Sequence, residues 1–513
     1  MIARLRKRAV RPAAPLALLL FAFMSLGCAS AGASARPPKL EIEAPVPSAW
    51  STFPSQRVRA ELPRPEQLGT EGLGVKTLAG TWWQAFGDSE LDRLIELVLE
   101  SNRDLRSAAA RLDAALAQAR IAGAARKPLA TLSADDARRQ QNFIGFPIPG
   151  SEDGVLTSTS TTLGASLNVS WEVDLWGRIR DGRLAAQAGA EAAVHDLDAA
   201  RLSITGQTAK AWFGFLEAAG QAALAQETLA NRTDVRKRIE RRYRQGLRTA
   251  LELRLAAANE ANAEARHAVR KRRQDAIGRQ LEVLLARNAE ALQIIAGSTS
   301  ALPALPPPAA PGLPGDVLRW RPDLRASERR LAAAGLNIAA ARKLLYPRLT
   351  LTGSTGTTSR EFDGFLNPDF SVWSLAAGLL QPLFQGGRLR AGVELSEAGH
   401  RDVLAQHENA VIRAVTEIEA QLANDAYLEE QQSAVTKAKQ ASSAAEALAQ
   451  DRYFAGLSDY LSVLAAQDQA ITAASRLLEV DRLRLEQRVD LFLALGGNGP
   501  SASAMATETE ESK

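Results

Sequence analysis

The chain has 513 residues, of which 46% are hydrophobic and 23% are charged, and its formal net charge is +4. This composition indicates a folded protein of two or three domains and excludes an intrinsically disordered chain. The single cysteine excludes a disulfide framework and a multi-cysteine metal site. No pattern of residues predicts an enzyme active site, a cofactor site or a metal site.

Residues 1–27 are predicted to be a secretory signal peptide. They begin with a basic segment and continue with an apolar run from Ala13 to Leu26, which is too short to span a bilayer comfortably as a helix. They contain five basic side chains and no acidic one, so their removal changes the formal net charge from +4 to 4 − 5 = −1. The positive charge therefore belongs to targeting and does not indicate nucleic-acid binding.

Cys28 stands directly after the apolar run, as does the acylated cysteine of bacterial lipoproteins. Gly27 and Leu26 suit positions −1 and −2 of such a signal, whereas Ser25 occupies position −3, where an aliphatic residue is usual. We expect lipidation at Cys28, with ordinary cleavage at residues 33–35 as the alternative. Residues 28–80 are rich in proline and serine toward their start and are predicted to form an extended arm anchored by the lipid.

Residues 81–496 contain an internal tandem repeat. The segment Asn102–Leu132 matches Arg321–Leu351 at an offset of 219 positions, whereas later anchors, such as Gly177 with Gly387, match at an offset of 210 positions. The first copy, residues 81–297, therefore has nine extra residues before Gly177. A proline-rich linker, residues 298–315, leads to the second copy, residues 316–496, and residues 497–513 form a polar tail.

Each copy is predicted to contain a helix, a β-hairpin and a long helical region, at residues 177–297 and 387–496. Both helical regions lack proline, which would kink or end a helix. A helix of about 60 residues would be about 90 Å long. A heptad repeat in the second region predicts a coiled-coil seam with a left-handed supercoil. The members of this seam are Leu457, Leu464, Ile471, Leu478, Leu485 and Phe492.

The hairpins are expected at about residues 129–174 and 348–384, with strands at about 129–137, 162–174, 348–356 and 372–384. The segment Leu163–Asp174 alternates between apolar residues at odd positions and small or polar residues at even positions. One interpretation is a soluble hairpin with one face on a core. Export, a strand length near the roughly 9–11 residues that cross a bilayer, and a polar face suited to water favour a membrane strand instead.

In the membrane interpretation the two faces of this strand have different surroundings. The face expected to contact lipid carries Leu167, Val169, Trp171 and Val173, and the face expected to line a pore carries Ser166, Asn168, Ser170 and Glu172. Four strands do not close a barrel, because single-chain barrels begin at about eight strands and open edges are not tolerated in hydrocarbon. Several chains would therefore have to pool their strands.

Several dispersed motifs, in chain order, resemble one family. They are WWQAFGDSELDRLIELVLESNRDL at 82–105, WEVDLWGR at 171–178, YRQGLRTALELRLA at 243–256, GLPGDVLRWRPDLRASERRL at 312–331 and YFAGLSDYLSVLAAQ at 453–467. Together with the duplication they resemble the TolC-like outer-membrane efflux factors, in particular the NodT/OprM-like lipoprotein branch that serves resistance-nodulation-division (RND) pumps. The resemblance covers residues 82–497.

The resemblance implies a mainly α-helical fold with a small β part and a homotrimeric assembly. Four strands per chain would give a shared twelve-stranded transmembrane β-barrel, and the helices would form a long coiled-coil tunnel in the periplasm. The implied function is passive passage of small molecules such as drugs or toxic compounds. An inner-membrane RND pump would supply the energy through a periplasmic adaptor, because the chain has no phosphate-binding loop for a nucleotide.

In the family the periplasmic end of the tunnel closes near the stretch that matches Tyr453–Gln467. The gate candidates carried over to this chain are Asp459, Ser462, Leu464 and Ala465. Relatives commonly have an aspartate at the position of Ala465, so an acidic ring there is not supported. Asp459 either faces the lumen or caps a helix after Gly456. In the first copy Arg248, Glu252 and Arg254 occupy the corresponding turn and are candidates for bonds that hold the gate shut.

Two alternatives remain open from the sequence. An exported coiled-coil adaptor or structural lipoprotein explains the heptads but not two matching hairpins. A type I secretion exit duct keeps the channel and passes polypeptides instead of small molecules.

Overall fold

The computed structural model describes residues 81–143, 156–286, 301–308, 320–364 and 367–497. The chain divides into two compact units, Met1–Glu43 and Ala44–Lys513, and every described residue belongs to the second. The predicted signal peptide, Cys28 and the N-terminal arm lie outside the described residues. No helix among the described residues has both the length and the apolar character needed to cross a membrane.

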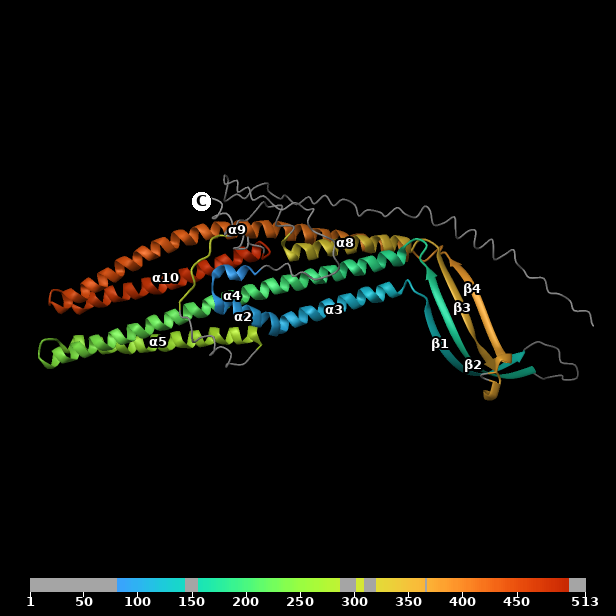
Figure 1. Cartoon of the computed structure of the whole chain (residues 1–513), viewed down its shortest axis with the longest axis horizontal. Helices are drawn as coiled ribbons and strands as arrows, with labels where there is room; N and C mark the ends of the chain where they lie inside the picture. The colour runs from blue at the N-terminus through green and yellow to red at the C-terminus, as the bar shows by residue number, and fades with distance from the viewer. Residues whose placement is uncertain (1–80, 144–155, 287–300, 309–319, 365–366, 498–513) are drawn as a thin grey trace, which may run out of the picture. The chain divides into compact units, whose positions relative to one another are not determined.

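The internal repeat predicted from the sequence is visible in the order of the elements (Figure 1). The first copy contains α3 (Arg103–Ala124), β1 (Leu129–Phe143), β2 (Leu156–Val173), α4 (Arg178–Arg244) and α5 (Ala250–Leu285). The second contains α8 (Pro322–Lys343), β3 (Arg348–Ser359), β4 (Ser371–Leu380), α9 (Arg388–Phe454) and α10 (Tyr460–Ala494). A short 3-10 helix, η2 (Trp82–Phe86), and α2 (Ser89–Ser101) precede the first copy.

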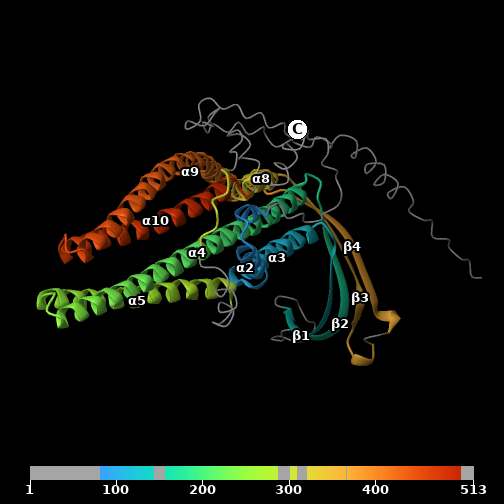
Figure 2. The same cartoon turned by 60° about the vertical axis from the view of Figure 1, so that its left-hand side comes forward.

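Each long helical region is a hairpin of two helices. Helices α4 and α9 have 67 residues each, which corresponds to about 100 Å, and α5 and α10 return antiparallel beside them (Figure 2). The turns contain Gly246 and Gly456, whose φ angles of 73° and 80° lie in the left-handed region that favours glycine. These two glycines are separated by the second offset of the repeat, so the turns are equivalent positions of the two copies.

The heptad seam was predicted to begin at Leu457, which is one heptad before its first residue in a helix. Leu457 lies in the turn between α9 and α10 and is 70% exposed. The left-handed Gly456 ends the helical path, so the seam begins at Leu464 within α10.

The four strands form one antiparallel sheet in the order β1-β2-β3-β4. The register of the two hairpins follows the repeat, because Leu129 pairs with Ser170 and Arg348 pairs with Leu380. Leu129 and Arg348 are separated by the first offset found in the sequence, and Ser170 and Leu380 are separated by the second.

The strand ends differ from the prediction in two ways. Strand β4 ends at Leu380 and not at residue 384, because Pro382 has no N–H for a ladder hydrogen bond. Strands β1 and β3 extend to Phe143 and Ser359, and β2 begins at Leu156, in each case beyond the apolar alternation. The added part of β2 is the threonine- and serine-rich segment 157–162, in which β-branched threonines favour a strand without an apolar pattern.

The main hydrophobic core lies where α2 and η2 pack against α4, α5 and α10. Trp82 stacks on Phe492 with the ring centroids 5.7 Å apart, so the start of the described chain is fixed to the end of α10. Trp212 is fully buried in α4 and donates its Nε1–H to Asp88 Oδ2 at 2.7 Å. The other carboxylate oxygen of Asp88 caps α2 by accepting from the backbone of Glu90 and Leu91.

Candidate functional site

One face of the sheet carries large apolar side chains on β1, β2 and β4 in its middle rows and is not covered by the described chain. In one cross-strand row Leu132, Leu167, Thr355 and Trp373 are neighbours, and in the next Ala130, Val169, Gly353 and Leu375 are neighbours. Leu132 is 80% exposed, Trp373 is 79% exposed and Leu375 is 80% exposed. The predicted lipid-facing residues Leu167, Val169, Trp171 and Val173 all belong to this face.

The opposite face is polar at the same level of the sheet. Thr131, Asn168, Ser354 and Ser374 form one row across the four strands. Asn168 Nδ2 donates to Ser133 Oγ at 3.1 Å and to Ser166 Oγ at 3.0 Å. Ser354 and Ser374 share a hydroxyl–hydroxyl bond of 2.8 Å. The predicted pore-facing residues Ser166, Asn168, Ser170 and Glu172 belong to this face.

Aromatic and charged side chains mark the end of the sheet that meets the helices. Trp176 donates its Nε1–H to the backbone oxygen of Pro347 at 2.8 Å and packs against Tyr346, with ring centroids 5.3 Å apart. Glu172, on the polar face, forms an ion pair of 2.8 Å with Arg178 at the start of α4. Aromatic side chains with a polar handle are typical of the boundary between hydrocarbon and water.

At the opposite end of the helices, a small buried cluster joins the two helical hairpins. This tip cluster consists of Ile239, Ala256, Tyr453, Tyr460 and Val463. Arg248, from the turn of the first hairpin, lies over the ring of Tyr453 at 4.2 Å from the centroid and donates to the Tyr453 backbone oxygen at 3.2 Å. Burial raises the pKa of Tyr453, so its phenol is neutral.

A second basic contact lies deeper between the hairpins. Arg232 of α4 is 3% exposed, donates to Gln467 Oε1 and forms an ion pair of 3.1 Å with Asp468 of α10. Contacts between copy one and copy two therefore occur at two levels near the tip, at Arg232 and at Arg248.

Asp459 caps a helix, which supports the second of the two roles left open by the sequence. It is the N-cap residue of α10, and its Oδ1 accepts from the backbone N–H of Ser462 at 2.9 Å and from the Ser462 hydroxyl. These hydrogen bonds lower the pKa of Asp459. Thr249, at the equivalent position of the first copy, caps α5 in the same way, in a capping box with Glu252.

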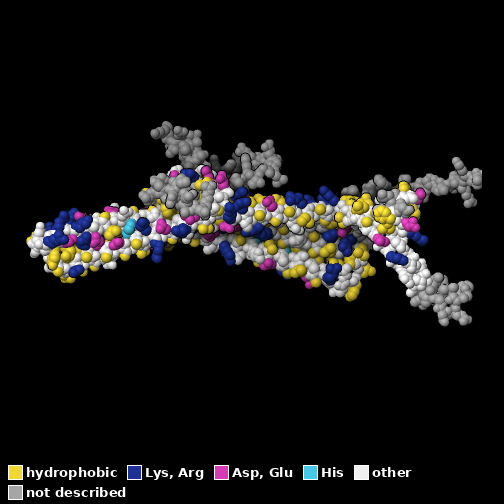
Figure 3. Space-filling model, turned by 90° about the horizontal axis from the view of Figure 1, so that it is seen from below, with side chains coloured by type: hydrophobic (Ala, Val, Ile, Leu, Met, Phe, Trp, Pro, Cys, Tyr) yellow, Lys and Arg dark blue, Asp and Glu magenta, His cyan; other side chains and the backbone are white. Residues whose placement is uncertain are grey.

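The remaining gate candidates have different surroundings. Leu464 is half-buried and packs against the tip cluster, whereas Ala465 is exposed. Arg248 and Glu252 lie 3.6 Å apart as an ion pair, and Arg254 is exposed on α5. Four leucines at equivalent positions of the two turns are exposed, and hydrophobic side chains gather at this end of the helices (Figure 3). They are Leu247, Leu251, Leu457 and Leu461.

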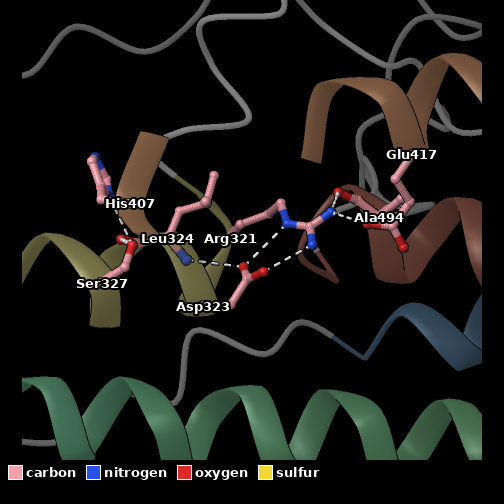
Figure 4. Close-up of polar contacts among 7 residues, drawn as sticks. All are labelled: Arg321, Asp323, Leu324, Ser327, His407, Glu417 and Ala494. Atoms are coloured by element: carbon pink, nitrogen blue, oxygen red, sulfur yellow. Dashed lines mark hydrogen bonds and ion pairs between the residues drawn. The ribbon is translucent and has the colours of Figure 1, made fainter. Parts of the chain in front are cut away.

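A polar joint that the sequence did not single out lies at the start of α8 (Figure 4). Arg321 binds both carboxylate oxygens of Asp323, the nearer contact being 2.9 Å, and its Nη1 contacts Glu417 of α9 at 2.6 Å. The same Nη1 donates to the backbone oxygen of Ala494 at the end of α10 at 3.2 Å. Arg321 therefore joins three helices of the second copy.

At the equivalent position of the first copy, a neutral residue makes the corresponding contact with the end of a helix. Asn102, the counterpart of Arg321 in the repeat, donates its Nδ2–H to the backbone oxygen of Leu284 at the end of α5 at 2.9 Å. The alignment of the two copies pairs Asn102 with Arg321, and this pairing is the sequence signal that points to the polar joint. Near it, His407 of α9 is buried and hydrogen-bonded to Ser327 at 2.8 Å (Figure 4), and burial lowers the pKa of His407.

Comparison with known proteins gives the family. The family model for "Outer membrane efflux protein" matches residues 94–287 and 313–497, which are the two copies of the repeat. This chain belongs to the outer membrane efflux protein family. The resemblance inferred from the sequence motifs is thereby confirmed.

Two curated relatives and one solved structure show how far the likeness of this outer membrane efflux protein extends. It is 32% identical to outer membrane protein OprJ of Pseudomonas aeruginosa, over 95% of this chain and 96% of that protein. It is 30% identical to the toluene efflux pump outer membrane protein TtgF of Pseudomonas putida, over 94% of this chain and 97% of that protein.

The solved structure is that of the Neisseria gonorrhoeae MtrE outer membrane channel in its open state. It matches with a TM-score of 0.67 and 30% identity, over 80% of this chain and 89% of that chain. The predicted fold class and outer-membrane location are confirmed, because this chain is an efflux channel protein of the outer membrane with a mainly helical, internally duplicated fold.

Proposed function

We propose that this outer membrane efflux protein is a homotrimer whose twelve strands close one β-barrel in the outer membrane. The observation that carries the proposal is the four-stranded sheet, whose outer strands β1 and β4 each have a single partner strand in the described chain. An unpaired strand edge is not tolerated in hydrocarbon, so a barrel must be closed by strands of other copies. Three copies give twelve strands, an even number within the range of bacterial barrels.

The two faces of the sheet support this arrangement. The exposed apolar face with Leu167, Val169 and Trp373 contacts lipid, and the polar face with Ser166, Asn168 and Glu172 lines the pore. Strand β2 pairs with β3 along the whole segment Leu163–Val173. At about 3.3 Å per residue and a tilt near 45°, this segment spans the roughly 25 Å apolar band of an outer-membrane barrel.

The channel is the passive exit of a tripartite efflux system. The relative TtgF is described as part of a toluene efflux pump, which supports small molecules as cargo. An inner-membrane RND pump supplies the energy through a periplasmic adaptor, and lipidation at Cys28 adds a second anchor beside the barrel. Family membership argues against the adaptor-lipoprotein alternative, and the type I exit duct is the second candidate.

The tip forms the periplasmic gate. The candidates Arg248 and Glu252 of the first turn and Leu464 of α10 lie at or beside the tip cluster, where the two hairpins meet. The contact of Arg248 with Tyr453 holds the second hairpin against the first, which keeps the tip of each protomer narrow. Asp459, Ser462, Ala465 and Arg254 lie at the rim of the same region.

The test begins with the protein mass of the detergent-solubilised membrane extract, measured by light scattering. We expect a trimer of the mature chain, and a monomer would overturn the proposed assembly. Transport is then measured in a strain that lacks its own outer-membrane channel but has an RND pump and adaptor. Restored resistance to small toxic compounds is expected, whereas restored secretion of a polypeptide without such resistance would favour the type I duct.

A further inference from the structure

A groove lies on the helices next to the sheet, where α3, α4, α8 and α9 run side by side (Figure 1). Its volume is about 700 Å³, which is within the range of small-molecule binding sites. All four helices line it, although α3 and α9 are the outer two of the row, so the groove is the concave face of the row. Glu172 of the polar sheet face pairs with Arg178, which lines the groove. The polar face of the sheet therefore continues into this groove.

The lining of the groove is apolar except for a few polar and basic side chains. Most of the lining residues are alanine, glycine, leucine, isoleucine or valine, and no carboxylate is among the described residues that line it. The polar members are Arg178, Arg183, Asn337, Ser396 and His400. Because Arg178 is paired with Glu172, the uncompensated positive charge of the groove is that of Arg183.

Arg183 of α4 has an unused hydrogen-bond donor. Its Nε–H is buried and has no partner in the part of the chain that the structure describes, and its Nη1 makes only a long contact of 3.5 Å with Gln187 Oε1. A buried donor without a partner costs free energy, which a ligand with an acceptor would recover. A guanidinium matches a carboxylate best, because the two groups form a pair of parallel hydrogen bonds. The unused donor of Arg183 therefore points to an anionic ligand.

The internal repeat shows that the helical path does not require basic side chains at these positions. Val393 stands at the position of the second copy that is equivalent to Arg183, and Ala190 stands at the position of the first copy that is equivalent to His400. Helices α4 and α9 thus form with an apolar residue at one of the two equivalent positions. Arg183 and His400 are additions to the common plan of the repeat, and both line the same groove.

We infer that this groove is a binding site for organic anions, compounds that carry a carboxylate on an apolar body. Arg183 binds the carboxylate, and His400 and Asn337 are further polar partners from α9 and α8. The alanines of the lining, together with Ile179 and Leu344, contact the apolar body. The inference rests on the proposed function in one respect, which is that the groove opens onto the tunnel. Anions of this class would bind there on their way to the barrel.

Equilibrium dialysis of radiolabelled naphthoate tests the site, with the full-length protein in phosphatidylcholine nanodiscs and empty nanodiscs as the background. Naphthoate carries one carboxylate on an apolar ring system. We expect one saturable site per chain. Unlabelled naphthoate should displace the label, whereas naphthylmethylammonium, a cation with the same apolar body, should need at least about a tenfold higher concentration, because it cannot accept a hydrogen bond from Arg183. Equal displacement by the two compounds would overturn the inference.

Two variants of neighbouring arginines locate the site. Arg183→Gln keeps a polar side chain but removes the charge, and it should weaken naphthoate binding at least about tenfold. Arg180→Gln is the matched control, because it removes the same charge from the same turn of α4 but from a residue that does not line the groove. The control should bind naphthoate like the natural protein. Light scattering of each variant checks that its assembly is unchanged.

The outcomes separate this inference from the proposed function. A trimer that binds no more naphthoate than empty nanodiscs overturns the anion site and leaves the channel standing. The same holds for a trimer in which Arg183→Gln and Arg180→Gln bind equally well. A monomer overturns the proposed assembly instead. Because all the lining residues belong to one chain, naphthoate binding that depends on Arg183 in a monomer would still support the site.

Discussion

The contact between Arg248 and Tyr453 gives the sharpest test of the proposed gate. Replacing Arg248 by alanine removes a cation held 4.2 Å from the centroid of a buried ring and a hydrogen bond of 3.2 Å to the Tyr453 backbone oxygen. A cation–π contact beside a buried ring contributes about 1–2 kcal/mol, and a hydrogen bond from a charged donor contributes about 1.5–3 kcal/mol. The ion pair with Glu252 joins residues of the same hairpin and does not connect the two hairpins.

Taking the lower ends of both ranges, Arg248→Ala weakens the link between the hairpins by about 2.5 kcal/mol, which corresponds to about a seventyfold change in an equilibrium constant. If the link closes the tip, the open fraction of the trimer rises accordingly. The measurement is single-channel conductance of purified trimers in planar bilayers, and we expect longer and more frequent openings.

Arg244→Ala is the matched control for this experiment. The Arg244 side chain, on the same tip, is 76% exposed and forms an ion pair of 2.7 Å with Glu240 of the same helix, which does not connect the two hairpins. Trimers of the control variant should conduct like those of the natural protein. The gate proposal is wrong if Arg248→Ala conducts like the control while the trimer remains intact.

Four further outcomes are expected. Cys28→Ser should abolish acylation, measured by labelled palmitate, yet leave much of the trimer in the outer membrane, because the barrel anchors it; complete loss of trimer would contradict this. Leu478→Pro should break α10 at a cost of about 3 kcal/mol or more and reduce trimer yield and export, whereas unchanged yield would show that the helix tolerates a break there. Arg321→Ala should lower the melting temperature clearly more than Arg330→Ala, because Arg321 joins three helices whereas Arg330 is an exposed partner of Asp196; equal shifts would show that the joint is not a stabilising one. His407 has a folded-state pKa below its unfolded value, so its stabilising contribution is complete above about pH 6.5 and is lost as the pH falls through the folded pKa. His407→Gln should therefore flatten the decline of melting temperature between about pH 7 and pH 5, and an unchanged slope would exclude His407 as its source.

Much of the fold follows from the sequence because the repeat and the periodicity are strong signals. Alternation identified β2, and the absence of proline identified the long helices. The polar extension of β1 carries charged residues on both faces, at Arg138 and Arg139, so its strand came from pairing with β2 and not from its own pattern. Tertiary pairing of this kind has no local signature.

Only part of the candidate site could be predicted from the sequence. The two faces of β2 could be assigned from alternate residues, whereas the role of Asp459 depended on its hydrogen bonds to Ser462. The contact of Arg248 with Tyr453 joins residues 205 positions apart, and no spacing rule connects them. The role of Arg321 could not be predicted from its local sequence, because its partners Glu417 and the Ala494 backbone oxygen are also remote in the sequence.

The unequal support of α4 and α9 has a mechanical consequence. In its tip-side half α4 has buried residues at Thr228, Arg232 and Ile239, since it lies between α5 and α10, whereas α9 has no buried described residue between Leu422 and Tyr453. A helix packed between two helices bends less than a helix packed on one. Within a single protomer the α9–α10 hairpin is therefore the more compliant of the two, and a force applied at the turns bends the second copy more than the first.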